Sequence, residues 1–115
     1  MGRLTTHVLD TARGLPAAAV DVVLYRVHPE LRELARGRTN ADGRLDQPIL
    51  QGDDFTTGVY QLVFQAGDYF RAHASNPEPL FVDEVVLRFG ISDPEQHYHV
   101  PLLVSPFAYS TYRGS

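Results

Sequence analysis

The 115-residue sequence predicts an all-β protein, an antiparallel β-sandwich, and three observations support this prediction. Short segments rich in valine, leucine and tyrosine alternate apolar with polar side chains, which is the period of a half-buried strand. Turn-forming residues separate these segments at short intervals. Only one stretch has the residue types of a helix, and no repeat marks an internal boundary. We therefore predict a single domain over residues 1–115.

Seven or eight strands are expected along the chain. The first is RLTTHVLD at 3–10, which alternates and contains β-branched residues. The second, at 18–27, carries apolar side chains on both faces, which indicates that both faces are covered. The segment LRELARGRT is more polar and fits either a short edge strand or a frayed helix. The remaining strands are expected at 58–64, 83–91, 97–106 and 107–112.

Turns and one helix complete the expected pattern. NADGR, at 40–44, contains the Asp-Gly pair, a strong signal for a tight turn because glycine tolerates positive φ. QAGDYFRAHASN has the composition of one short helix, closed by Asn76 and Pro77. SDPEQ separates two strands near the end of the chain. Short strands with connections of a few residues favour an antiparallel β-sandwich.

Composition excludes several classes of function. The net charge is −4 and no run of lysine or arginine occurs, so we expect no nucleic-acid partner. There is no cysteine, which excludes disulfides and thiolate metal sites. The apolar runs are far shorter than the roughly 20 residues of a membrane span. No basic and apolar leader opens the chain, and we expect no membrane partner. The final RGS does not match the peroxisomal Ser-Lys-Leu signal, so we expect a cytoplasmic protein of a bacterium.

Strand alternation sorts the histidines near the end of the chain. Tyr98 and every second residue after it form an unbroken apolar row that has to face the core. His97 and His99 therefore lie on the other face, toward solvent, an interface or a cleft. In the first strand Leu4 and Val8 are the expected core pair, so His7 also points away from the core. His28 and His73 fall in a loop and in the helix and are read as ordinary surface side chains.

These residues leave several chemical interpretations open. A single histidine on a strand is more often a solvated side chain than a catalyst. His97 and His99 have the spacing of two metal ligands, but only His7 offers itself as a further one, and a closed zinc site needs four. Arg44 follows the Asp-Gly turn and is either a surface charge or a planar donor for a carbonyl or an oxyanion.

Four stretches together resemble one protein family: LTTHVLDTARGLPA, RTNADGR, GVYQLVF and HYHVPLLVSPFAYSTYRGS. They occur in the order, and nearly over the length, of the transthyretin family. The terminal YRGS resembles the family's 5-hydroxyisourate hydrolase branch rather than its hormone carriers. The resemblance implies a transthyretin-like sandwich of two four-stranded sheets with one short helix. It also implies a homotetramer with active sites in a channel between subunits, which the non-core histidine face would line.

The resemblance further implies an activity in urate breakdown. The enzymes of this branch hydrolyse the N1–C6 amide bond of 5-hydroxyisourate to give 2-oxo-4-hydroxy-4-carboxy-5-ureidoimidazoline, and they need neither metal nor organic cofactor. His7, Arg44, His99 and Ser115 match the family's catalytic positions. His7 and Arg44, with Tyr112, match positions that bind the substrate. His97 and Arg113 are expected as neighbours, and His97 stays open as the second catalytic histidine.

A neutral imidazole has an ordinary pKa of about 6.5 and can act as a base near neutral pH. We expect His7 and His99 to share a water molecule, one taking its proton and the other orienting it or protonating the leaving nitrogen. Arg44 would stabilise the oxyanion. Two other functions fit the fold: a carrier that binds a small ligand without catalysis, and an interaction module in which the histidines are bystanders. A carrier favours mainly apolar walls, which a lining of histidine and arginine does not provide.

Overall fold

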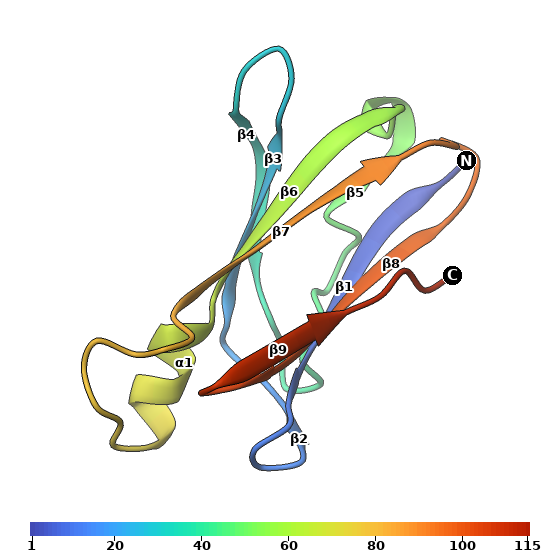
Figure 1. The fold of residues 1–115 in the computed structure, drawn as a ribbon. Coiled ribbons are helices and arrows are strands. Elements are labelled where there is room, and N and C mark those ends of the chain that lie inside the picture. Colours follow the sequence, from blue (N-terminus) through green and yellow to red (C-terminus); the bar gives the residue numbers. More distant parts are fainter.

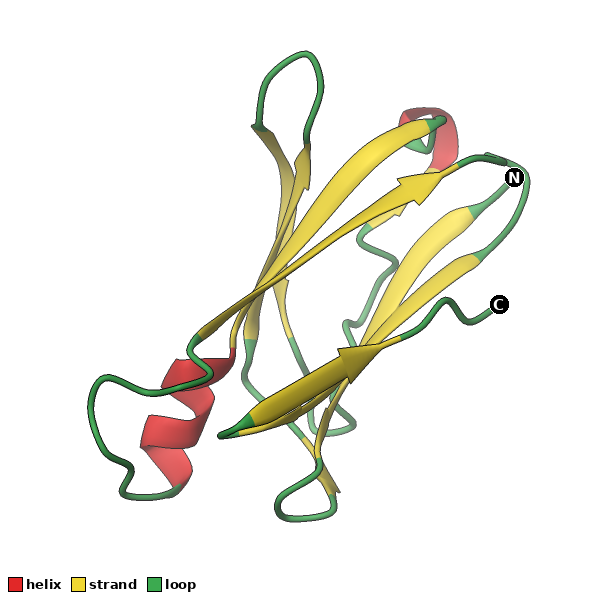
Figure 2. Ribbon diagram, in the orientation of Figure 1, coloured by secondary structure: helices red, strands yellow, loops and turns green.

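The computed structural model describes all residues 1–115 and consists of two facing sheets with a helix at one end (Figures 1 and 2). One sheet has the order β2–β1–β8–β9, with β5 pairing to the start of β1. Its strands are β1 (Arg3–Asp10), β2 (Leu15–Pro16), β5 (Leu50–Gln51), β8 (Tyr98–Ser105) and β9 (Ala108–Thr111). We call it the β1–β8 sheet.

The second sheet has the antiparallel order β4–β3–β6–β7. Its strands are β3 (Asp21–Arg26), β4 (Arg32–Arg38), β6 (Gly58–Gln65) and β7 (Glu84–Ile91). The helix α1 (Ala66–His73) directly follows β6, and a single 3-10 turn, η1 (Gly52–Asp54), follows β5. Neither helix is long and apolar enough to cross a membrane.

The predicted β-sandwich with one short α-helix is confirmed, and two details differ from expectation. The β1–β8 sheet has five strands rather than four, because the two-residue strands β2 and β5 are too short to leave a periodic signal. In addition, β1 and β8 run parallel, so the sandwich is not antiparallel throughout. These strands come from opposite ends of the chain, and no hairpin forces them to be antiparallel.

The ambiguous segment after residue 30 is an edge strand. β4 pairs with β3 on one side only, and its exposed flank carries charged residues. Charged side chains on an edge strand discourage pairing with other chains. A helix would have left the same charges unpaired with the sheet, whereas Arg38 here binds Asp21 of β3 through two hydrogen bonds of 2.8 and 3.2 Å.

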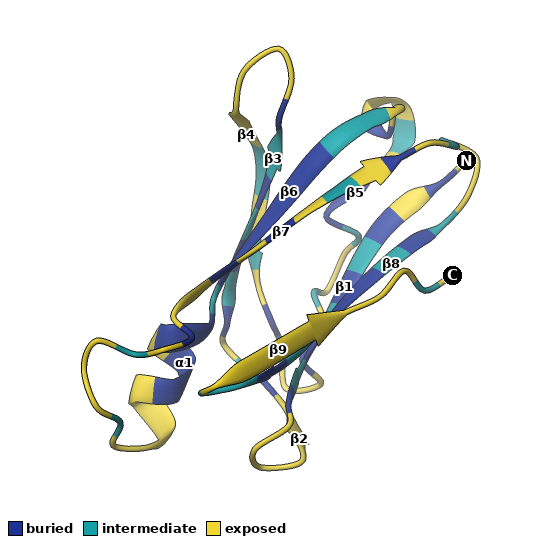
Figure 3. Ribbon diagram, viewed as in Figure 1, coloured by how far each residue is buried: buried dark blue, intermediate teal, exposed yellow.

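The core fills the space between the sheets (Figure 3). The alternation predicted for β1 and β8 is observed, because the core-facing residues of both strands are almost fully buried. They are Leu4, Thr6, Val8 and Asp10 of β1, and Tyr98, Val100, Leu102 and Val104 of β8. Across the core they face the buried side chains of β3 and β6. Because successive side chains of a strand point to opposite faces, burial of one face of β1 and β8 directs their remaining side chains to the outer face of the sheet.

The far end of β1 is held by a buried carboxylate. Asp10 accepts hydrogen bonds from the backbone amides of Ala12 and Arg13 at 3.0 and 3.1 Å and from the Tyr69 hydroxyl at 2.7 Å. The last bond ties β1 to α1. A buried carboxylate with three donors is well satisfied and adds rigidity. The strand that carries His7 is therefore anchored at its end as well as along its core face.

Candidate functional site

The outer face of the β1–β8 sheet brings two histidines and a threonine together. In the parallel register Thr5 lies directly opposite His99. The Thr5 hydroxyl oxygen is 2.8 Å from His99 Nδ1 and 3.0 Å from His97 Nε2. All three side chains are half-buried. The hydroxyl thus connects the two imidazoles that alternation had placed on one face.

His7, on the same face, is joined to the turn that carries Arg44. Its Nε2 is 2.8 Å from the carbonyl oxygen of Asp42. A carbonyl oxygen only accepts, so this nitrogen carries the proton and Nδ1 of the neutral ring is free to accept one. His7 and Arg44 also form an isolated antiparallel bridge. The backbone therefore places the arginine beside the first histidine.

The turn itself is built as its sequence predicts. Asn40 accepts hydrogen bonds from the amides of Asp42 and Arg44 at 2.9 and 3.2 Å. Gly43 has a φ of 76°, in the left-handed region that favours glycine. A Cβ at this position would also collide with the carbonyl oxygen of Val8, which lies against the turn. The Asp-Gly pair is thus required both by its φ and by the close approach of β1.

The surrounding charges favour neutral histidines. Burial lowers the pKa of His99, and the charges of Arg44, His7 and His97 lower it further. Burial likewise lowers the pKa of His97, with added contributions from Arg3 and Arg113. A lowered pKa keeps an imidazole in its proton-accepting form near neutral pH. The site therefore combines neutral imidazoles with a nearby guanidinium, which can assist proton abstraction and stabilise a developing oxyanion.

The end of the chain runs alongside His99. The backbone amide of Gly114 donates to the His99 carbonyl at 2.7 Å, and the His99 amide donates back to Gly114 at 3.2 Å. A Cβ on Gly114 would lie 3.2 Å from both Cβ and Cδ2 of His99. Only glycine fits this approach without displacement. The terminal segment is thus held against the site by backbone bonds.

The other predicted residues in the terminal segment are placed differently. Arg113 donates to the Gln96 side chain and to the His97 carbonyl at 3.0 and 3.1 Å, and its guanidinium lies 4.2 Å from the Tyr98 ring centroid. It anchors the segment and is a neighbour of His97. Tyr112 is 61% exposed and forms no hydrogen bond with the other predicted site residues. Ser115 is exposed and adjoins Gly114.

The remaining histidines lie apart from this face. His73, in α1, pairs its Nδ1 with the Arg13 guanidinium at 3.0 Å and packs against the Tyr69 ring. His28 lies in the loop between β3 and β4. No three histidine, aspartate or glutamate side chains converge in the manner of a metal site. His7, His97 and His99 share a face, but their side chains do not form a cluster that could hold a metal ion.

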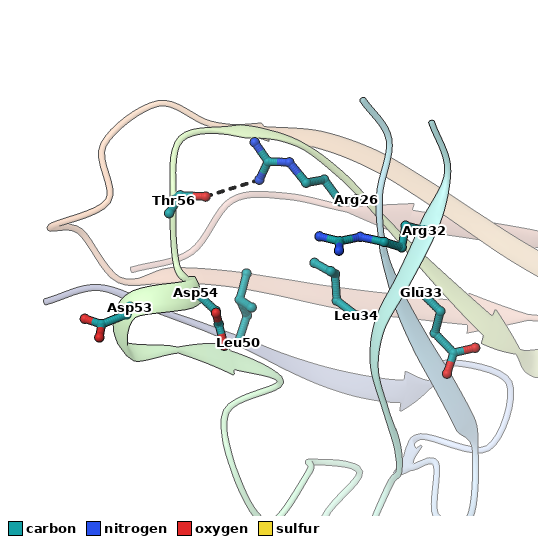
Figure 4. A pocket seen from close by; sticks show the side chains of 8 residues that line it. All are labelled: Arg26, Arg32, Glu33, Leu34, Leu50, Asp53, Asp54 and Thr56. Atoms are coloured by element: carbon teal, nitrogen blue, oxygen red, sulfur yellow. Dashed lines mark hydrogen bonds between the residues drawn. The ribbon is translucent and has the colours of Figure 1, made fainter. Parts of the chain in front are cut away.

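One pocket of the chain lies away from the histidine face. It has a volume of about 500 Å³ and opens between the β3–β4 hairpin and the segment around η1 (Figure 4). Arginine and acidic side chains line it, and none of the predicted site residues takes part. A smaller pocket of about 250 Å³ includes Arg3 and Thr5, beside the histidine face. Within one chain the histidine face is thus open rather than enclosed.

Three contributors to the site were absent from the sequence interpretation: the Thr5 hydroxyl, the Asp42 carbonyl and the Gly114 backbone. Thr5 shares the face of His7, so alternation alone would have placed it there. The carbonyl of Asp42 has no side-chain signal. Gly114 lies within the YRGS motif, where its lack of a side chain is the only local sign of a close contact.

The Gly114 contact generates a prediction. Gly114→Ala should displace the terminal segment from His99, because the added methyl would lie 3.2 Å from Cβ and Cδ2 of His99. Amide hydrogen exchange at residues 99 and 114 should accelerate about 2- to 10-fold, since one backbone hydrogen bond is worth about 0.5–1.5 kcal/mol. Gly90→Ala is the matched control, because a Cβ there meets nothing closer than 4.0 Å. Unchanged exchange in Gly114→Ala would contradict this packing.

The electrostatics generate a second prediction. Arg44→Gln should raise the pKa of His99, since the guanidinium disfavours a positively charged imidazole. An NMR titration of His99 should show its midpoint moving upward. Arg38→Gln, which removes a guanidinium paired with Asp21 in the other sheet, should leave it in place. A midpoint that stays fixed in Arg44→Gln would show that the guanidinium does not act on His99.

The chain is similar to known proteins over nearly its whole length. The profile of the HIUase/Transthyretin family matches residues 4–114. A 5-hydroxyisourate hydrolase of Pseudomonas aeruginosa is 63% identical, covering 100% of this chain and 93% of that protein. The structure of Klebsiella pneumoniae 5-hydroxyisourate hydrolase is 36% identical with a TM-score of 0.81, and each chain is covered completely.

A longer protein contains a closely similar unit. The crystal structure of (S)-allantoin synthase matches 99% of this chain with 46% identity and a TM-score of 0.95. This chain spans 44% of that one. The fold, its sequence motifs and the family profile agree over nearly every residue, and the chain belongs to the HIUase/Transthyretin family.

Proposed function

We propose that this chain is an enzyme that hydrolyses 5-hydroxyisourate to 2-oxo-4-hydroxy-4-carboxy-5-ureidoimidazoline. The observation that carries the proposal is the juxtaposition of His7, Arg44 and His99 on one open face, with the histidine at 99 kept neutral. The full-length identity to the Pseudomonas aeruginosa hydrolase supports the same activity. No metal or organic cofactor is assigned to the reaction.

Hydrolysis of the ring amide requires a base, a stabiliser for the oxyanion and a proton for the leaving nitrogen. One of the two histidines takes a proton from water while the water oxygen adds to C6. The C6–N1 bond then breaks, N1 receives a proton, and C6 becomes a carboxylate. General-base help of this kind is worth on the order of 10²–10⁴ in rate. We assign the proton transfers and the orientation of the water to His99 and His7.

The environment of each histidine supports a division of these roles. The Nδ1 of His7 is its only accepting nitrogen, because Nε2 donates to the Asp42 carbonyl. His99 uses Nδ1 toward Thr5, which leaves Nε2 for the reaction. The lowered pKa of His99 makes it the better candidate for the base, since it stays unprotonated at neutral pH. His7 then orients the water through Nδ1, and the proton that His99 has taken up passes to the leaving nitrogen.

Arg44 is assigned to the developing negative charge on the carbonyl oxygen. Its charge helps to lower the pKa of His99, and its bridge to His7 puts it on the histidine face, which supports this assignment. A planar donor group suits the carbonyls of a urate-like heterocycle. Ser115 and Tyr112 are assigned to the wall of the site and to hydrogen bonds with the heterocycle. His97 and Arg113 are assigned to its support.

We further propose that the active unit is a homotetramer, with the histidine face lining a channel between subunits. Large apolar side chains are exposed in and next to β9, the edge strand of the sheet that carries this face. They are Tyr109 in the strand, Phe107 in the turn before it and Tyr112 directly after it. All four residues of β9, at the edge of the sheet, are exposed (Figure 3). Exposed apolar groups at a sheet edge mark association surfaces. We assign the assembled protein to the bacterial cytoplasm.

A carrier without catalysis is the alternative within the same fold. Its ligand site would use the same channel, so position alone does not separate the two functions. The polar, titratable lining of His7, Arg44 and His99 favours the hydrolase, because a carrier site has mainly apolar walls with few polar groups. An enzyme accelerates the loss of the substrate, whereas a carrier only binds it, so the experiment measures turnover.

The experiment generates 5-hydroxyisourate in a cuvette from urate and urate oxidase and follows its absorbance decay. The substrate decays unaided, so the rate in buffer is the reference. Wild-type protein should accelerate the decay, and His99→Ala should lose about 10²-fold or more of that acceleration, the worth of a general base. His28→Ala, which alters a histidine in a distant loop, should behave as wild type.

Light scattering on the same samples tests the assembly, with a tetramer expected for all three proteins. A wild-type tetramer that binds the compound without accelerating its decay would favour the carrier. A monomer that nevertheless turns over substrate would refute the tetrameric site. Equal acceleration by His99→Ala and wild type would remove His99 from the catalytic residues.

A further inference from the structure

The Thr5 hydroxyl sits between two imidazoles and has a single hydrogen. It lies 2.8 Å from His99 Nδ1 and 3.0 Å from His97 Nε2. A hydroxyl donates once and accepts through its lone pairs. It therefore donates to one ring and accepts from the other. When both rings are neutral, the two histidines have to adopt complementary protonation states at the nitrogens that face Thr5.

We propose that Thr5 is a positioning residue that couples the tautomers of His97 and His99 and holds Nε2 of His99 unprotonated. In this arrangement His99 Nδ1–H donates to Thr5, and the Thr5 hydroxyl donates to His97 Nε2. His97 then carries its proton on Nδ1. The chain of two hydrogen bonds runs in one direction, from His99 through Thr5 to His97.

The charges around His99 select this direction over its reverse. With Nδ1 engaged by Thr5, the nitrogen left for the open face is Nε2. Arg44 acts on this ring from the turn after β4, which lies against β1, and a guanidinium only donates hydrogen bonds. Arg44 pairs with His7 across an antiparallel bridge and therefore shares the open face, where its charge favours a lone pair on Nε2 over an N–H. The reversed chain would instead present an N–H on that face.

The charges around His97 keep the second ring neutral. Arg3 at the start of β1 and Arg113 in the terminal segment both disfavour its protonated form, in addition to burial. His99 is disfavoured in its charged form by Arg44, His7 and His97. If both rings were protonated, each would donate to Thr5 and the hydroxyl hydrogen would lose its acceptor. The coupled arrangement therefore holds only while at most one of the two rings is positively charged.

This coupling deepens the proposed hydrolase function and rests on it for its catalytic consequence. His99 can accept a proton from water only at an unprotonated Nε2. When that proton arrives, the imidazolium keeps its Nδ1–H bond to Thr5, and the same Nε2 proton can then pass to the leaving nitrogen. Control of a base by the partner of its other ring nitrogen is a general feature of histidine catalysis.

The test reads the tautomers directly from two-bond proton–nitrogen correlations of ¹⁵N-histidine-labelled protein near pH 7.5. Wild type should show His99 protonated at Nδ1 and bare at Nε2. His97→Phe removes the acceptor of the Thr5 hydroxyl, so this hydroxyl should turn to His99 Nδ1 and shift the His99 proton to Nε2. The substitution would thus invert a tautomer without touching the His99 ring.

Activity provides the second readout. Thr5→Val keeps the β-branched shape and should lower kcat about 10-fold or more with little change in KM, because a general base is worth about 10²–10⁴. Thr5→Ser retains the hydroxyl and should recover most of the loss. Thr11→Val is the matched control, since it removes a hydroxyl that bonds to β8 at Val104, away from the histidines.

The two readouts separate the coupling from the proposed function. Wild-type His99 found protonated at Nε2, or a His99 tautomer unaffected by His97→Phe, would overturn the coupling even if the protein hydrolyses the substrate. Wild type that does not hydrolyse the substrate but shows the expected tautomers would refute the hydrolase and retain the coupling. Full activity in Thr5→Val would remove Thr5 from the positioning residues.

Discussion

The site depends on the parallel pairing of β1 with β8. This register sets Thr5 opposite His99 and His7 opposite Pro101, so that groups from the two ends of the chain share one outer face. The buried face enforces the register through side chains such as Val8 and Leu102. If either strand slipped by one residue, its apolar row would face solvent and its histidines would face the core. Core packing thus aligns the chemistry on the opposite side of the sheet.

Two backbone attachments bring further groups to this pair of strands. The tight turn at 40–44 lies against β1, where the Val8 amide donates to the Gly43 carbonyl at 2.8 Å. The terminal segment lies along β8 through the mutual bonds of His99 and Gly114. Each attachment contains a glycine at the point of contact: a Cβ on Gly43 would collide with the Val8 carbonyl oxygen, and a Cβ on Gly114 would lie 3.2 Å from Cβ and Cδ2 of His99. Arg44 and the chain end are thereby held near the histidines by main-chain contacts, which substitutions of other side chains disturb little.

The features that depend on short stretches of the sequence were predicted correctly. The bounds of β1, the faces of β1 and β8 and the turn before Arg44 follow from alternation and from Asp-Gly, and each is observed. The parallel pairing was not predictable, because strand periodicity carries no information on partners more than 90 residues apart. The Thr5 bridge depends on that pairing and was missed with it. The family resemblance supplied the assignment of His7, Arg44 and His99, which periodicity alone left among several interpretations.

The most direct test of this account is a crystal structure of the protein with bound urate, a stable ring that resembles the proposed substrate. We expect the heterocycle on the outer face of the β1–β8 sheet, within hydrogen-bond distance of Arg44 and of Nε2 of His99, with the His97–Thr5–His99 chain intact. Urate bound instead in the pocket between the β3–β4 hairpin and η1, with the histidine face empty, would contradict it.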